Sequence, residues 1–279
     1  MEYRPRIPRE GINVTERHPL SELVILIAGI AAVVAALVVA AFAFIEVAIR
    51  WVPPSFESRL FGRLWSADAG SEQEDPRLEA ATAVLGRLAS HWEGNPYELQ
   101  LAIMEEQTPN AFAVPGGMIY LTRGLLESVE SENELAFILG HELGHFRNRD
   151  HLRALGRGLI VSLTLSALIG GSAAESVPRV ATTLTQNGFA REQEREADTF
   201  GIALVQAEYG HVAGTDGFFR RLPDATAGIG DEFASYLATH PVSEARIEAL
   251  RSLARENGWS VTGELTTLPR LTSGHSRGS

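Results

Sequence analysis

Two histidines and a glutamate near the middle of the chain have the spacing of a metal-dependent hydrolytic site. His141, Glu142 and His145 form an H-E-x-x-H pattern, and on a helix the two imidazoles would lie on one face. Such a pair can hold one zinc ion, with ligand nitrogens about 2.0–2.1 Å from the metal. Glu142 would lie beside the first ligand and could take a proton from water that the ion has made acidic.

The residues before this pattern predict the helix that would carry it. Ser131 and Glu134 have the spacing of a capping box, and apolar residues then recur with helical periodicity up to Leu143. A chain with eight histidines can contain H-E-x-x-H by chance, and buried histidines are often purely structural. Two histidines that flank a glutamate on an apolar helix favour the metal site over that alternative.

Composition narrows both the chemistry and the partners. The 279-residue chain has no cysteine, which excludes disulfides, thiolate catalysis and cysteine-ligated zinc. A net charge of -11 argues against nucleic acid as a partner. The hydrophobic fraction of 45% is sufficient for the core of one good-sized domain with appendages.

An apolar segment near the amino terminus predicts a transmembrane helix at 23–49. It is interrupted only by Glu46 and is long enough to cross a hydrocarbon core of about 30 Å. A cleaved signal peptide is the weaker alternative, because the segment is long and lacks a clear cleavage site. We interpret Glu46 as tolerated near the membrane interface rather than functional. The arginine bias favours a cytoplasmic amino terminus and hence a main domain on the non-cytoplasmic side. We expect a single-pass protein of a bacterial inner membrane.

The rest of the chain divides into four parts, and the fold class expected is α+β, mainly α. The parts are a polar arm at 1–22, a juxtamembrane linker at 50–75, a domain at 76–257 and a flexible tail at 258–279. Short β-rich segments at 97–105, 111–114 and 118–122 predict a small antiparallel sheet. The expected helices lie at 76–92, 124–129, 177–207, 216–222, 231–238 and 243–256. Residues 159–171 are expected to form an interfacial or core-packed hairpin, with a second membrane insertion as the alternative.

A catalytic zinc also needs a third protein ligand. Glu192, Glu194 and Glu196 are the candidates in an acid-rich helical segment. Periodicity favours Glu194 together with Asp198, because residues at i and i+4 share a helix face and could act as a ligand and its hydrogen-bonding partner. A solvated charged face is the alternative that spacing alone leaves open.

Four groups of residues, in this order, resemble the HtpX and BepA-like membrane-associated zinc metallopeptidases, a gluzincin family that includes the CAAX prenyl proteases and Oma-type proteases. They are Pro109–Phe112 with Pro115–Gly117, His141–His145, Glu194–Asp198, and Thr239–Pro241 with Arg246. The resemblance implies a zincin-like domain that holds one Zn²⁺, with Glu194 as the third ligand.

The resemblance also implies roles that the pattern alone leaves unassigned. His240 would donate to the transition state or, in a closed state, act as a fourth ligand, and Arg246 would support His240 or the substrate carbonyl. The hairpin around Phe112 would align an extended peptide by strand addition. The expected substrate-binding residues are Asn110, Ala111, Phe112, Gly116 and Gly117.

The chain departs from these proteins in showing one clear membrane span and no tetratricopeptide region. The expectation is a membrane-anchored zinc endopeptidase that uses Glu142 as its base and acts on misfolded membrane or envelope proteins. The alternatives are a catalytically latent zinc-binding adaptor and a membrane scaffold whose histidine pair is structural.

Overall fold

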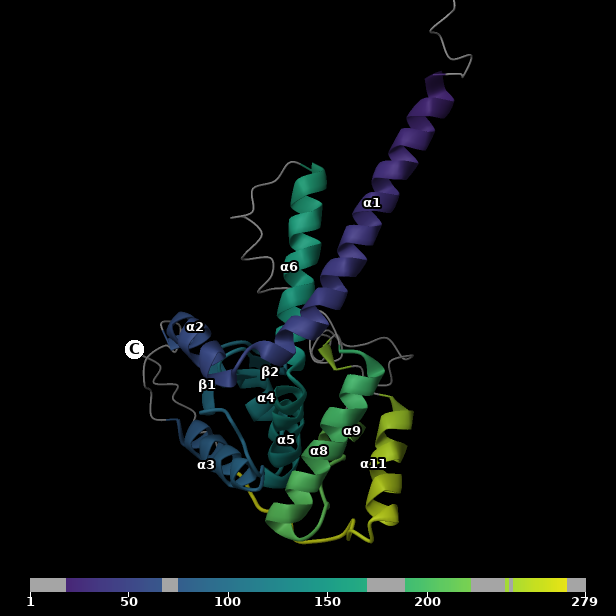
Figure 1. Ribbon diagram of the computed structural model, residues 1–279. Helices are drawn as coiled ribbons and strands as arrows, with labels where there is room; N and C mark the ends of the chain where they lie inside the picture. The colour runs from purple at the N-terminus through teal and green to yellow at the C-terminus, as the bar shows by residue number, and fades with distance from the viewer. Residues whose placement is uncertain (1–18, 67–74, 170–188, 222–238, 241–242, 270–279) are drawn as a thin grey trace, which may run out of the picture.

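A computed structural model describes residues 19–66, 75–169, 189–221, 239–240 and 243–269. Helices surround a small sheet in a globular part, from which α1 and α6 project (Figure 1). The predicted class, α+β and mainly α, is confirmed.

The helices are α1 (Pro19–Ala48), α2 (Pro54–Ser66), α3 (Pro76–Ser90), α4 (Arg123–Ser128), α5 (Glu132–Asn148), α6 (Asp150–Ile169), α8 (Arg191–Tyr209), α9 (Gly217–Arg221) and α11 (Glu244–Glu256), with a 3₁₀ turn at Ile49–Trp51. The strands are β1 (Gln100–Met104), β2 (Ala111–Val114) and β3 (Met118–Thr122).

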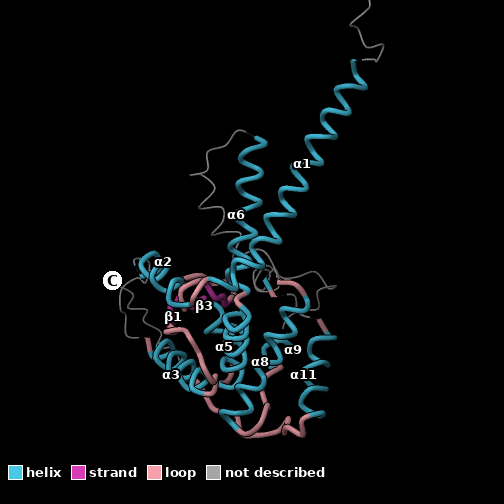
Figure 2. Tube along the Cα trace, in the orientation of Figure 1, coloured by secondary structure: helices cyan, strands magenta, loops and turns pink. Residues whose placement is uncertain are grey.

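The sheet is mixed rather than antiparallel throughout. The strands, which are magenta in Figure 2, have the order β1-β3-β2 in the described residues, with β2 antiparallel and β1 parallel to β3. A tight turn joins β2 to β3, and Gly116 and Gly117 supply its positive φ angles of 104° and 94°. The antiparallel prediction is therefore wrong for β1, because local turn residues specify only the β2–β3 pair, whereas tertiary packing places β1.

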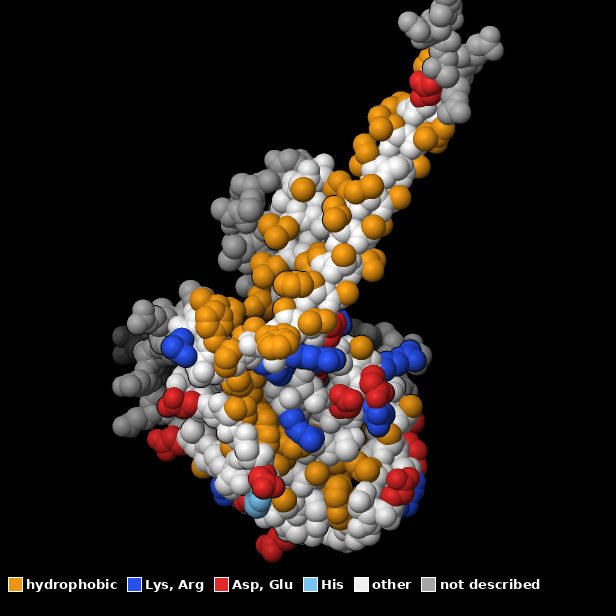
Figure 3. All heavy atoms as spheres, viewed as in Figure 1, with side chains coloured by type: hydrophobic (Ala, Val, Ile, Leu, Met, Phe, Trp, Pro, Cys, Tyr) orange, Lys and Arg blue, Asp and Glu red, His pale blue; other side chains and the backbone are white. Residues whose placement is uncertain are grey.

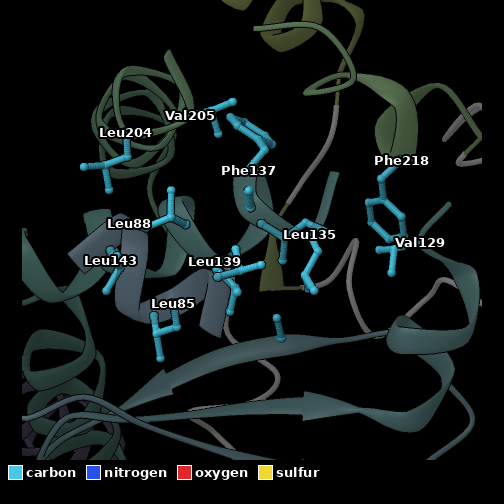
Figure 4. Close-up of a cluster of buried hydrophobic side chains, with 14 of the residues drawn as sticks. Leu85, Leu88, Val129, Leu135, Phe137, Leu139, Leu143, Leu204, Val205 and Phe218 are labelled. Atoms are coloured by element: carbon cyan, nitrogen blue, oxygen red, sulfur yellow. The ribbon is translucent and has the colours of Figure 1, made fainter. Parts of the chain in front are cut away.

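Helix α5 is the centre of the core. Its residues are buried from Asn133 to Phe146. Figure 4 shows Leu88 of α3, Leu139 of α5 and Leu204 of α8 gathered in one apolar cluster. Full burial of each such side chain contributes about 1.5–3 kcal/mol, so the surrounding helices hold α5 in a fixed position.

The contact between α5 and α8 is close at the level of the backbone. A Cβ added at Gly144 would lie 2.6 Å from Ala197 Cα, and one added at Gly201 would lie 2.8 Å from the His141 backbone nitrogen. Only residues without a Cβ permit this separation of the two helices. The approach brings the acidic first turns of α8 against the H-E-x-x-H face of α5.

One helical segment of the described structure, Pro19–Trp51, is long and apolar enough to span a membrane. Hydrophobic side chains cover α1 and α6, whereas charged side chains gather on the globular part (Figure 3). Helix α6 packs beside α1, with Gly156 against Ile45. Exposed leucines and a valine continue along α6. The hairpin predicted at 159–171 is wrong up to Ile169, since α6 is one continuous helix there, and 170–171 lie outside the described residues.

Two segments predicted to be irregular have regular or packed structure. Helix α2 lies within the expected linker. In the expected tail, the Glu132 N–H donates to Thr266 O (2.8 Å), and the Thr266 N–H donates to Asn133 Oδ1 (3.0 Å). Trp259 and Leu268 pack against the core. We call residues 258–269 the carboxyl-terminal strap. Its polar composition did not predict this packing, because hydrogen bonds of the backbone hold much of the strap in place.

Other predicted boundaries shift by a few residues or lie outside the described structure. The helix predicted to span the membrane begins at Pro19, so the last residues of the predicted arm are helical. Helix α9 corresponds to the helix expected at 216–222. Of the predicted helix at 177–207, the structure describes the part from 191 onward, in α8. The helix predicted at 231–238 lies outside the described residues.

Replacing Gly144 by alanine tests the close helix contact. Gly144→Ala should lower the free energy of unfolding by about 1–3 kcal/mol, because the new methyl group meets the Ala197 backbone. Gly86→Ala is the matched control: Gly86 lies in α3 with open space around its Cβ position, so this change should stabilise the helix by about 0.5–1 kcal/mol. Denaturant unfolding of the detergent-solubilised full chain measures both. Equal stability of the two variants would contradict the packing.

Candidate metal centre

Helix α5 carries the H-E-x-x-H residues into the middle of the globular part. The Ser131 side chain accepts a hydrogen bond from a backbone N–H of the first turn (3.2 Å), as the sequence predicts. The helix ends at Asn148, and the left-handed φ of 60° at the next residue, Arg149, turns the chain into α6. His141, Glu142 and His145 are fully buried on this helix, so their polar atoms must find partners inside the protein.

A carboxylate orients each of the two imidazoles. His141 Nδ1 lies 2.9 Å from Asp198 Oδ1, and His145 Nδ1 lies 3.0 Å from Asp150 Oδ2. A neutral ring that donates from Nδ1 has its lone pair on Nε2, and the two Nε2 atoms are 3.1 Å apart. Lone pairs that face each other at this distance repel unless a proton or a metal cation lies between them.

Glu194 of α8 and His240 complete a group of four ligand atoms. Glu194 Oε1 lies 3.4 Å from His145 Nε2, and Oε2 lies 3.6 Å from His141 Nε2. His240 Nδ1 is 3.1 Å from both His141 Nε2 and Glu194 Oε1. All four atoms lie within 4.8 Å of one another and belong to buried side chains. The structure thus brings together the three predicted ligands and the predicted fourth.

This group fits a divalent transition metal. Tetrahedral ligands about 2.0–2.1 Å from zinc would be about 3.3 Å apart, and the separations of 3.1, 3.4 and 3.6 Å are close to that value. Imidazole nitrogens with one carboxylate are ligands that zinc and its neighbours accept. The four side chains can therefore hold one such ion.

The two histidines differ in their affinity for protons. Burial lowers the pKa of His141, and the nearby carboxylates of Glu194 and Asp198 only partly offset that effect. Burial also disfavours charge on His145, but its hydrogen bonds to Asp150 and Glu194 raise its pKa to about 9. In the metal-free protein at neutral pH His145 is therefore protonated on both ring nitrogens, and metal binding must displace the proton on Nε2.

Arg246 binds two acids of α8, Asp198 and Glu194. Its Nε and Nη2 lie 2.8 and 2.7 Å from the two carboxylate oxygens of Asp198, and its Nη1 lies 2.6 Å from Glu194 Oε2. Burial opposes ionisation of Glu194, but electrostatic interaction with the imidazoles of His240 and His141, together with the hydrogen bond from His145, holds its pKa well below the usual range. The pKa of Asp198 is also lowered against the effect of burial, first by the His141 hydrogen bond and then by Arg246. Both acids are thus ionised and available to accept.

Glu142 lies between the ligand group and the sheet. Its Oε2 accepts a hydrogen bond from the Ala113 N–H of β2 (3.0 Å), and its Oε1 lies 3.4 Å from His240 Nε2. The Ala113 N–H that reaches Glu142 points away from β3, toward the open side of β2. The carboxylate is therefore fixed beside the ligands and next to the strand edge.

The predicted substrate-binding residues lie along the same hairpin. Ala111 and Phe112 are in β2, whose edge faces Glu142 through Ala113. Asn110 Oδ1 accepts a hydrogen bond from the hydroxyl of the residue before His240 (3.4 Å). Gly116 and Gly117 form the turn at the other end of β2. The predicted residues are Asn110, Ala111, Phe112, Gly116 and Gly117.

Sequence reasoning missed two residues that contact His145. Asp150 accepts from its Nδ1, and Phe189 stacks on the ring with centroids 3.9 Å apart. An acid just beyond the end of the ligand helix was the available signal for Asp150. Phe189 lies far from His145 in the sequence, and no pattern marked it.

Comparison with known proteins identifies the family. The model of peptidase family M48 matches residues 72–254. The mitochondrial metalloendopeptidase OMA1 of Arabidopsis thaliana is 29% identical over 184 residues, which cover 64% of this chain and 35% of that protein. The protease HtpX homolog of Pyrococcus abyssi is 30% identical over 234 residues, covering 70% of this chain and 79% of that protein. The beta-barrel assembly-enhancing protease of Escherichia coli is 27% identical over 195 residues, covering 65% and 40%.

Two of these matches cover only part of a longer relative: 35% of the plant protein and 40% of the Escherichia coli protein. The matched region of the family model nevertheless contains the H-E-x-x-H helix, Glu194, His240 and Arg246. The resemblance inferred from the sequence motifs is thereby confirmed. With the buried ligand group held between α5 and α8, the chain belongs to peptidase family M48.

Proposed function

We propose that the protein is a membrane-anchored zinc endopeptidase that cleaves misfolded membrane or envelope proteins. The observation that carries this proposal is the juxtaposition of the four ligand atoms with the buried carboxylate of Glu142. The relatives named for metalloendopeptidase and assembly-enhancing protease activity support the substrate class. The apolar helix α1 supports an anchored enzyme that meets its substrates at a membrane.

His141, His145 and Glu194 would hold the ion, and Asp198, Asp150 and Arg246 would fix their orientation. Zinc, when bound, polarises a carbonyl oxygen and makes water acidic enough to lose a proton near neutral pH. Glu142 takes that proton and passes it to the leaving amine. The hydrogen bond from Ala113 keeps the Glu142 carboxylate in place without neutralising it.

Substrate would bind as an extended segment beside β2. The Ala113 N–H on the open side of this strand donates to Glu142, which supports this placement, and strand addition would recognise backbone without requiring a particular sequence. Asn110, Ala111 and Phe112 would line this position, and Gly116 and Gly117 would keep the turn at the far end of β2 compact.

His240 supports a second candidate state in which the enzyme is latent. Its Nδ1 lies within the ligand group, 3.1 Å from His141 Nε2, where it would act as a fourth ligand and leave no position for water. Withdrawn from that position, the same imidazole would donate to the oxyanion of the transition state. A permanently closed form would be a zinc-binding adaptor, which is the alternative to the protease.

Glu142→Gln tests the assigned base. The variant should keep its zinc and lose on the order of 10²–10⁴ in turnover, because the amide cannot accept the proton. Cleavage of an unfolded polypeptide such as casein, with zinc content measured on the same sample, gives both quantities. Wild-type turnover by this variant would contradict the assignment, and zinc-loaded wild-type protein that never cleaves would favour the adaptor.

Glu194→Gln tests the third ligand. The variant should bind zinc about 10–100-fold more weakly in a competition titration, because an amide oxygen is a poorer ligand than an ionised carboxylate. Glu192→Gln is the matched control on the same helix, since Glu192 is exposed and pairs with Arg195 (2.5 Å). A chelator should abolish cleavage by the wild type, and added zinc should restore it. Equal zinc affinity of the two variants would contradict the ligand assignment.

Carboxyl-terminal reporter fusions test the proposed orientation. Alkaline phosphatase, which is active only after export, should be active when fused after the last residue, and a cytoplasmic β-galactosidase fusion should be inactive. The reason is the arginine bias on the amino-terminal side of α1. The reverse pattern would place the metal centre in the cytoplasm.

A further inference from the structure

A short chain of charged contacts connects the membrane helix to a ligand histidine. Arg153 of α6 donates from Nε to Glu46 Oε2 of α1 (2.8 Å) and from Nη1 to Asp150 Oδ1 (3.0 Å). The other carboxylate oxygen of Asp150 lies 3.0 Å from His145 Nδ1. Glu46 is therefore separated from a metal ligand by only two side chains.

Asp150 is fully buried, and its two carboxylate oxygens have different partners. Oδ1 accepts from Arg153 and from Gln193, whereas Oδ2 faces His145. Because two donors hold Oδ1, the carboxylate cannot rotate freely, and Oδ2 remains directed at the imidazole. The orientation of this acid determines which tautomer His145 adopts and where its Nε2 points.

Arg153 in turn is placed by Glu46. Its guanidinium is planar, so a hydrogen bond at one edge fixes the direction of the other edge. The backbone carbonyl of Asn148 also accepts from Nη1. Close packing of Gly156 on Ile45 sets the separation of α1 and α6 at this level. A movement of α1 relative to the domain would therefore alter the Arg153 contacts to both acids.

We propose that Glu46 is a positioning residue of the metal centre and acts on His145 through Arg153 and Asp150. The proposal rests on the proposed zinc site. It assigns a role to an acid that the sequence analysis interpreted as tolerated at the membrane interface. The anchor then contributes to metal affinity, and seating of α1 against α6 is part of assembling the site.

A second arginine provides a matched control. Arg157 Nη2 also binds Glu46, through Oε1 at 2.9 Å, but in the described structure no hydrogen bond joins Arg157 to Asp150. If Glu46 served only to clamp α1 to α6, loss of either arginine should have similar effects. If Glu46 acts through the chain of contacts, only loss of Arg153 should weaken zinc binding.

The experiment measures the zinc dissociation constant of the full chain in nanodiscs by competition with a chromophoric chelator. Arg153→Gln should weaken zinc binding by about 10-fold and Glu46→Gln by a factor between about 3 and 10, whereas Arg157→Gln should stay within about twofold of wild type. The double variant Glu46→Gln with Arg153→Gln should bind zinc like Arg153→Gln alone, because the two changes break one connection. Thermal unfolding of the metal-free proteins reports separately on how much the Glu46 contacts stabilise the packing of α1 on α6.

Three outcomes would overturn the proposal. Glu46→Gln and Arg157→Gln could have equal zinc affinities, which would mean that Glu46 only holds α1 against α6. This comparison tests the proposal even if Arg153→Gln does not fold. The effects of Glu46→Gln and Arg153→Gln could multiply in the double variant, which would make them independent. Wild-type protein could fail to bind zinc, which would contradict both the proposed function and this inference. If wild-type protein binds zinc, the variants test the role of Glu46 alone.

Discussion

The structure depends on the close contact of two helices at positions without side chains. Gly144 and Gly201 allow α5 and α8 to approach until backbone atoms meet, and no larger residue would permit Glu194 to lie 3.4 Å from His145 Nε2. The apolar residues of α3, α5 and α8 stabilise this approach from the other side (Figure 4). The ligand geometry is thus set by the packing of the two helices that carry the ligands.

Burial of so many ionisable groups requires that each has a partner. Unpaired charges would cost several kcal/mol each in this environment, but Asp198 has His141 and Arg246, and Asp150 has His145 and Arg153. The same pairs orient the imidazoles, so the contacts that make burial tolerable also select the ring nitrogen that faces the centre. Positioning of the ligands and compensation of charge are achieved by one set of side chains.

The sequence was most informative where a pattern is local. The H-E-x-x-H helix, its cap at Ser131 and the apolar length of α1 depend on neighbours in the chain, and the i,i+4 spacing of Glu194 and Asp198 correctly placed both acids on one face of α8. The parallel pairing of β1 with β3 and the packing of the carboxyl-terminal strap join distant residues, so no local pattern could specify them. Asp150 illustrates an intermediate case: it stood next to the motif, but only the turn at Arg149 directs it back to His145.

The carboxyl-terminal strap has a consequence for the order of events during synthesis. The first turn of α5 receives hydrogen bonds that involve Thr266, and this residue leaves the ribosome long after the H-E-x-x-H helix has emerged. The amino-terminal end of the ligand-bearing helix therefore cannot complete its bonding in a nascent chain. Completion of this helix end is coupled in this way to the synthesis of a segment 133 positions further along the chain.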